Sequence, residues 1–238
     1  MLFKAKILNI LSFGKYWLAY TLFLTILPSC TVGEVERPPH PEYRISCPPL
    51  VSSDAFYYEN GSFVFRLEKG QVGNCPSDRR PYSDPFFSFE FSERQEITMP
   101  LYDGVSIISF DFMASGASAQ RAAFFQIHDG RGKGAPPAWI GLNENWDVIF
   151  HDSLSRTYKR LAPNRIYHVE VRVDYEAPFI NSTYFIDGDE IRTIRAIESE
   201  ETDSPYGDRS YIKIGIYRVN SNGATTFSYQ NLEYRPVE

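Results

Sequence analysis

The stretch FFQIHDG contains two polar side chains that could act together on a ligand. In a β-strand, side chains two residues apart point to the same face. Gln126 and His128 therefore share one face, while Phe125 and Ile127 point the other way into a core. One interpretation is that this polar pair lines a site. The alternative is a solvated sheet face, which antiparallel sheets often have.

Two further segments place polar side chains in the same way. ERQEI puts Arg94 and Glu96 on one face. YIKIGIYR puts Tyr211, Lys213 and Tyr217 on one face and the intervening isoleucines on the other. Together the three segments supply the groups needed to hold and deprotonate an acidic sugar. Each residue taken alone also has an ordinary explanation, such as an edge-protecting lysine or a half-buried tyrosine.

These three segments, in this order, resemble the signatures of the jelly-roll polysaccharide lyases, which include alginate, glucuronan and heparin-lyase-like enzymes. The family motifs are an Arg-x-Glu-Leu strand, a Gln-Ile-His strand and a Tyr-x-Lys-x-Gly-x-Tyr strand. The likeness covers roughly residues 60 to 236. It implies an all-β, concanavalin-like jelly-roll β-sandwich with a concave substrate groove. The activity it implies is β-elimination of a uronic-acid polysaccharide.

The resemblance also implies roles for single residues. Arg94 and Gln126 would hold the uronate carboxylate with His128 alongside, and Tyr217 or His128 would move the protons. Substrate binding would involve a second set: Lys213, Glu96, Tyr211 and Arg218, with Arg131 and Lys133 from the basic loop that follows the Gln-Ile-His strand. No cofactor or metal is expected.

Two departures from the alginate lyases bear on the substrate. Where those enzymes often have Arg-Ser-Glu-Leu-Arg, this chain has Thr98 in place of the second arginine. Arg218 follows Tyr217 where many of them have Asn-Gln. Both differences favour a glucuronan-like or other uronate polymer over alginate.

The rest of the chain also predicts β-structure. Strand-like runs separated by turn signals continue to the C-terminus with little helical periodicity, which is typical of an all-β sandwich or barrel. DGD at residues 187 to 189 predicts a hairpin turn. Trp139 and Trp146 could stack on sugar rings or pack in the core. His151 and His168 are expected at the surface.

The N-terminus predicts export. Residues 1 to 29 combine three lysines with a long apolar run, as in a cleaved signal peptide. The four residues Leu27 to Cys30 resemble a lipoprotein cleavage box, so Cys30 would carry the lipid. Pro28 is unusual in such a box, which leaves simple secretion or a retained anchor open.

The remaining two cysteines could pair. If Cys30 is lipidated, Cys47 and Cys75 can form a disulfide in an oxidising compartment, or both can stay free. Residues 30 to 50 are proline-rich and predict a tether, and residues 51 to 238 would form the lyase domain.

Charge limits the partners. Removal of the signal leaves 21 basic against 30 acidic residues, a net charge of −9. This balance argues against nucleic acid, and an acidic polysaccharide must meet a local basic patch. We expect a monomer at the cell envelope, in contact with the membrane only through the lipid, or a secreted protein.

Three other functions fit parts of the pattern. A non-catalytic carbohydrate-binding jelly-roll lipoprotein would keep aromatics and a groove without needing the Arg, Gln-x-His and Lys-x-x-x-Tyr set. A glycoside hydrolase would need two carboxylates on the groove floor, and no such spacing is present. A structural surface lipoprotein is the third alternative.

Overall fold

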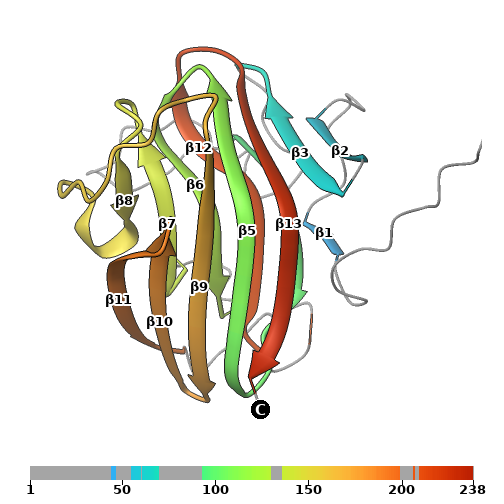
Figure 1. The fold of residues 1–238 in the computed structure, drawn as a ribbon, viewed down its shortest axis with the longest axis vertical. Coiled ribbons are helices and arrows are strands. Elements are labelled where there is room, and N and C mark those ends of the chain that lie inside the picture. The colour runs from blue at the N-terminus through green and yellow to red at the C-terminus, as the bar shows by residue number, and fades with distance from the viewer. Residues whose placement is uncertain are drawn as a thin grey trace, which may run out of the picture. The chain divides into compact units, whose positions relative to one another are not determined.

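Two antiparallel sheets pack face to face in this chain, as Figure 1 shows for the computed structural model. The structure describes residues 44–46, 55–59, 61–69, 93–129, 136–198, 206 and 209–237. All of them belong to one structural unit, Arg37–Glu238. The predicted all-β sandwich is confirmed.

One sheet has six strands and the other has seven. In spatial order the six-stranded sheet contains β1 (Arg44–Ser46), β4 (Glu93–Pro100), β12 (Tyr211–Ser221), β6 (Ala119–His128), β7 (Ala138–Asn143) and β8 (Val148–Phe150). The seven-stranded sheet contains β11 (Asp189–Ile197), β10 (Phe179–Ile186), β9 (Ile166–Glu176), β5 (Gly104–Gly116), β13 (Thr225–Val237), β3 (Ser62–Leu67) and β2 (Phe56–Glu59). The three segments with candidate site residues become β4, β12 and β6, which are direct neighbours.

Alternation gives β9 and β12 one face each in the core. In β9, Val169, Val171 and Val173 are fully buried, while His168 and Arg172 are exposed. The three isoleucines of β12 are likewise fully buried between the sheets: Ile212, Ile214 and Ile216. The residues that alternate with them must therefore lie on the outer face of the six-stranded sheet.

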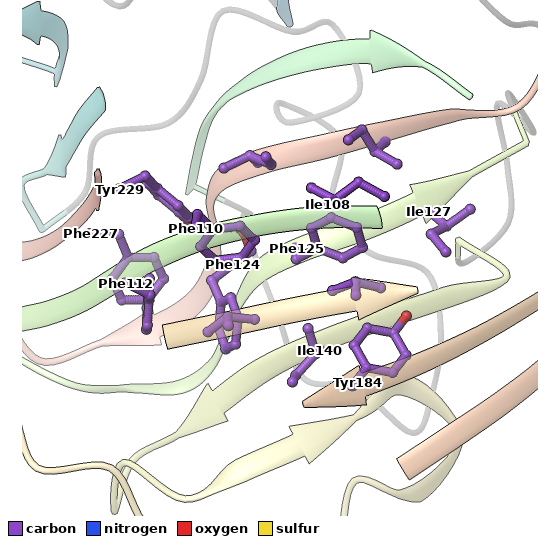
Figure 2. Close-up of a cluster of buried hydrophobic side chains, with 14 of the residues drawn as sticks. Ile108, Phe110, Phe112, Phe124, Phe125, Ile127, Ile140, Tyr184, Phe227 and Tyr229 are labelled. Atoms are coloured by element: carbon purple, nitrogen blue, oxygen red, sulfur yellow. Dashed lines mark hydrogen bonds between the residues drawn. The ribbon is translucent and has the colours of Figure 1, made fainter. Parts of the chain in front are cut away.

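Aromatic rings fill the space between the sheets (Figure 2). Phe112 from β5 stacks on Phe124 from β6 at 4.4 Å between ring centroids, and Phe110 stacks on Phe125 at 6.2 Å. Burying each ring stabilises the fold by about 1.5–3 kcal/mol. Phe124 and Phe125 are consecutive yet both buried, so β6 departs from regular alternation at this point.

The predictions for the turns and for the N-terminal segment had different outcomes. The predicted hairpin turn is confirmed: Asp187 and Gly188 join β10 to β11 with φ of 55° and 82°, the conformation that two-residue hairpins favour. Strand β1 lies inside the segment expected to be a tether, and β2 was not predicted. In the part of the chain that the structure describes, no helix has the length and hydropathy needed to cross a membrane.

A close contact between β12 and β4 sets the geometry of the outer face. Gly215 of β12 lies opposite Glu96 of β4 and has a φ of 147°, which side chains rarely allow. A Cβ at this position would lie 2.3 Å from the carbonyl oxygen of Gln95 and 2.7 Å from the Cα of Glu96. Only glycine lets the two backbones approach this closely.

We therefore expect Gly215→Ala to lower the free energy of unfolding by roughly 2–5 kcal/mol, because the methyl group adds a steric clash to the backbone strain. Gly188→Ala is the matched control. Gly188 also has positive φ, but no atom lies within 4 Å of the position that its added methyl group would take, so only strain of about 1–2 kcal/mol applies. Urea unfolding measures both values, and equal losses would contradict the close-contact argument.

Candidate active site

Arg94 and Tyr217 face each other across neighbouring strands. They are direct partners in the β4–β12 ladder, and both are half-buried on the outer face of the six-stranded sheet. The Arg94 Cζ lies 5.9 Å from the centroid of the Tyr217 ring. A guanidinium at this position contacts the aromatic ring and can hold an anionic ligand beside it.

A buried polar cluster lies next to this pair. Glu96 is two residues from Arg94, and its carboxylate accepts a hydrogen bond from the Gln126 amide across β12. The Lys213 Nζ lies 3.8 Å from the other carboxylate oxygen of Glu96. Gln126, Glu96 and Lys213 are only 3%, 1% and 6% exposed. A buried carboxylate that holds an amide and an ammonium fixes the orientation of both.

His128 and Tyr211 form a second aromatic group further along the same face. The two residues are ladder partners, and their rings stack at 5.0 Å. Lys213 connects this group to the polar cluster, since its Nζ lies 5.6 Å from the Tyr211 ring centroid. Tyr206 packs beside Tyr211 and donates a hydrogen bond to the Thr98 carbonyl at 2.7 Å.

The structure separates His128 from Tyr217 along the strands. Tyr217 lies opposite Ala123 of β6, whereas His128 lies opposite Tyr211. Ala123 and His128 are five residues apart, which corresponds to about 15 Å between backbone positions in a strand with one irregularity. The sequence-predicted set thus divides into an Arg94–Tyr217 end and a His128–Tyr211 end, joined by the buried cluster.

An irregularity in β6 sets this spacing, and Tyr229 supports it from the opposite sheet. The β12–β6 register shifts between Ile214 and Tyr217. At the shift, the Tyr229 hydroxyl from β13 lies 2.8 Å from the carbonyl oxygens of both Phe124 and Gly215, which share its proton. Burial raises the pKa of Tyr229 well above its usual range, so the phenol stays protonated as a donor.

The structure contradicts a substrate-binding role for Arg218. Its parity matches the isoleucines of β12, so its side chain points into the sandwich and is fully buried. The guanidinium donates to the carbonyl oxygens of Gly223 at 2.9 Å and Glu68 at 2.8 Å, and to Thr225 Oγ1. Arg218 therefore links the two sheets from inside.

A further cluster on the outer face was not predicted. Trp139 from β7 packs with Ala123, Ile149 and Tyr217, outside the main core. The Arg121 Cζ lies 5.6 Å over the Trp139 ring, and the His151 ring meets it edge-on at 6.0 Å. Alternation in the sequence indicates the sheet face on which the Trp139 side chain lies, but not its packing across three strands. Trp146, by contrast, packs against the main core.

Some predicted residues lie outside the described residues. They are Arg131 and Lys133 of the basic loop, the lipidation candidate Cys30, and the disulfide candidates Cys47 and Cys75. His168 is confirmed at the surface, where it contacts Asp111 at 2.9 Å on the seven-stranded sheet. Among the described side chains, no group of three His, Cys, Asp or Glu could hold a metal ion.

Comparison with known proteins supports the architecture. Neither a model of a known protein family nor a curated protein sequence matches the chain. An alginate lyase from Corynebacterium sp. superposes with a TM-score of 0.50 at 13% identity, over 77% of this chain and 82% of that chain. The chain has the jelly-roll fold of the alginate lyases.

Two other solved structures are similar. The family 7 alginate lyase A1-II′ gives a TM-score of 0.49 at 14% identity, over 77% of this chain and 84% of that chain. A sialidase gives 0.51 at 12% identity and covers 82% of this chain, but the chain spans only 17% of the sialidase. At these identities the likeness shows the fold, and function must be argued from the site.

The Tyr229 contact generates a stability prediction. We expect Tyr229→Phe to lower the free energy of unfolding by about 1–3 kcal/mol, because two buried carbonyl oxygens lose their donor while the ring packing is kept. Tyr184→Phe is the control, since that buried hydroxyl has one long hydrogen bond, from Ser182 Oγ at 3.3 Å. Chemical denaturation measures both variants. A loss no larger than that of Tyr184→Phe would contradict the support role.

Proposed function

We propose that this protein is a polysaccharide lyase that cleaves a 4-linked uronate polymer by β-elimination on the outer face of its six-stranded sheet. The observation that carries the proposal is the direct pairing of Arg94 with Tyr217 beside the Glu96–Gln126–Lys213 cluster. The jelly-roll fold of the alginate lyases supports it. No water is consumed in this reaction.

The chemistry matches the groups present. A base removes the C5 proton, the C4–O4 bond breaks, a C4=C5 double bond forms, and the departing O4 takes up a proton. Negative charge develops on the C5 carboxylate, so fixed donors that neutralise it lower the barrier; one such donor is typically worth about 3–4 kcal/mol. Arg94 supplies a positive charge beside this carboxylate. Glu96 orients the Gln126 amide, which can form a further hydrogen bond with the sugar.

Tyr217 is the proposed proton-transfer residue. An ordinary tyrosine has a pKa of about 10, so it needs a cation beside it to act as a base near neutral pH. Arg94 supplies a cation beside the ring. After taking the C5 proton, the same phenol can return it to O4. In the ladder register, His128 lies too far along β6 to take an equal part in this proton transfer. We therefore assign His128 to binding of a neighbouring sugar.

The other predicted residues receive supporting roles in this proposal. Glu96 carries the same charge as the substrate and is buried, so it orients Gln126 and Lys213 rather than binding sugar. Tyr211 supports His128 by stacking against its ring. Arg131 and Lys133 remain proposed substrate contacts, and Arg218 is removed from the site.

The buried polar cluster also fits one alternative function. Gln126 and Lys213 have little exposed surface, which suits a scaffold that binds a carbohydrate without cleaving it. A non-catalytic carbohydrate-binding jelly-roll protein is therefore the second candidate. Export and lipid anchoring through Cys30 are part of both proposals.

The first test separates the two functions. Incubation with glucuronan, alginate, heparin and related polymers should release unsaturated uronates, detected by their ultraviolet absorbance, without added metal. The expected signal rises with time on at least one polymer, because β-elimination creates a conjugated double bond. Binding to a polymer with no product on the whole panel would support the non-catalytic candidate instead.

The second test concerns Tyr217. We expect Tyr217→Phe to lower kcat by about 10²–10⁴-fold, the usual contribution of a general acid–base group. We expect His128→Ala mainly to raise KM. Near-ultraviolet circular dichroism checks that both variants keep the native packing. If His128→Ala lowers kcat as much as Tyr217→Phe, proton transfer by Tyr217 alone is wrong.

A further inference from the structure

Two guanidinium groups flank Tyr217 from the strands on either side. Arg94 lies directly opposite on β4. On β6, Arg121 lies opposite Val219, two residues from Tyr217, which makes Arg121 a diagonal neighbour. Diagonal neighbours in an antiparallel pair are about 7–8 Å apart, within reach of long side chains. Both arginines are half-buried on the same face as Tyr217.

Arg121 is held in place by Trp139. The guanidinium lies over the indole ring, an arrangement that stabilises a cation. Trp139 is only 4% exposed and packs on Ala123 and Ile149, so the indole is itself fixed. Tyr217 packs against the same cluster. The Arg121 side chain and the Tyr217 ring therefore contact one rigid support.

The chain near this cluster contains a histidine and two carboxylates that form ion pairs. His151 meets the edge of Trp139. Two acidic residues near His151 in the chain form ion pairs: Asp147 with Arg160 at 2.8 Å, and Asp152 with Arg192. The hydrogen bond from Arg160 lowers the pKa of Asp147, which favours the ionised carboxylate in this ion pair.

We propose that Arg121, supported by Trp139 and flanked by His151, forms a second acid-binding subsite for the carboxylate of the sugar next to the one on which Tyr217 acts. A guanidinium is suited to this because it can hold a carboxylate with two parallel hydrogen bonds. The subsite rests on the proposed function and specifies it further. Arg94 and Arg121 together select a polymer with acidic groups on adjacent sugars.

Binding measurements on oligomers of defined length test this subsite. The probes are disaccharides and tetrasaccharides of mannuronate, guluronate and glucuronate, titrated calorimetrically into protein that also carries Tyr217→Phe to prevent turnover. In this background, Arg121→Gln should weaken tetrasaccharide binding about tenfold and leave the disaccharide that occupies the Arg94 position unchanged. Arg121→Lys should lose less, because it keeps the charge but not the planar fork.

Arg172→Gln is the matched control. Arg172 also lies over an aromatic ring, that of Phe185 at 5.0 Å, but on the outer face of the other sheet. It should bind every oligomer like the parent protein. If Arg121→Gln also does so while the parent binds, the subsite is wrong and the proposed function stands. If the unsubstituted protein neither binds nor cleaves any uronate, the proposed function fails and the subsite falls with it.

Discussion

The close approach of β12 to β4 at Gly215 is the constraint on which the outer face depends. With no side chain at this position, the backbone of β12 lies against Gln95 and Glu96 at distances that any Cβ would prevent. The contact lies midway between Lys213 and Tyr217 on the same face of β12. It therefore sets both the pairing of Tyr217 with Arg94 and the distance from Lys213 to Glu96. A wider gap would separate the groups that the proposed reaction needs together.

The other side of β12 is controlled from the core. Phe124 and Phe125 both enter the sandwich, which forces a register shift between β6 and β12. At the shift, a phenol from the opposite sheet donates to a carbonyl oxygen of each strand. Tyr229 also packs edge-on against Phe65. Aromatic packing between the sheets thus positions polar groups on the outer surface.

Much of this arrangement follows from the sequence, because period-two alternation is a local property. It correctly placed the isoleucines of β12 in the core, and it put Gln126, Lys213 and Tyr217 on the outer face. The same rule assigns Arg218 to the core side. Its assignment to the substrate followed the position after a motif rather than the parity of the strand, and the structure corrects it.

Ladder register and burial could not be predicted in this way. Alternation fixes the face of a side chain but not its partner on the next strand, so the separation of His128 from Tyr217 required the register of β6 against β12. A β-bulge has no reliable signal in one sequence, and consecutive phenylalanines alone do not locate one. The burial of Glu96 and Lys213 depends on packing of segments far apart in the chain, which local patterns do not describe.

The buried polar cluster is itself an argument about function. Enclosing a carboxylate and an ammonium has a desolvation cost of several kcal/mol per ion, and an apolar pair of similar volume is often as stable or more so. A sheet face with only a structural role could use such a pair, as the opposite face of β12 does with its isoleucines. In the proposed function, the Glu96–Lys213 pair and the Gln126 amide bound to it serve as fixed polar groups beside the proposed reacting centre, where orientation matters more than stability. Their presence next to Arg94 and Tyr217, rather than elsewhere on the sheet, is what a site for an acidic sugar requires.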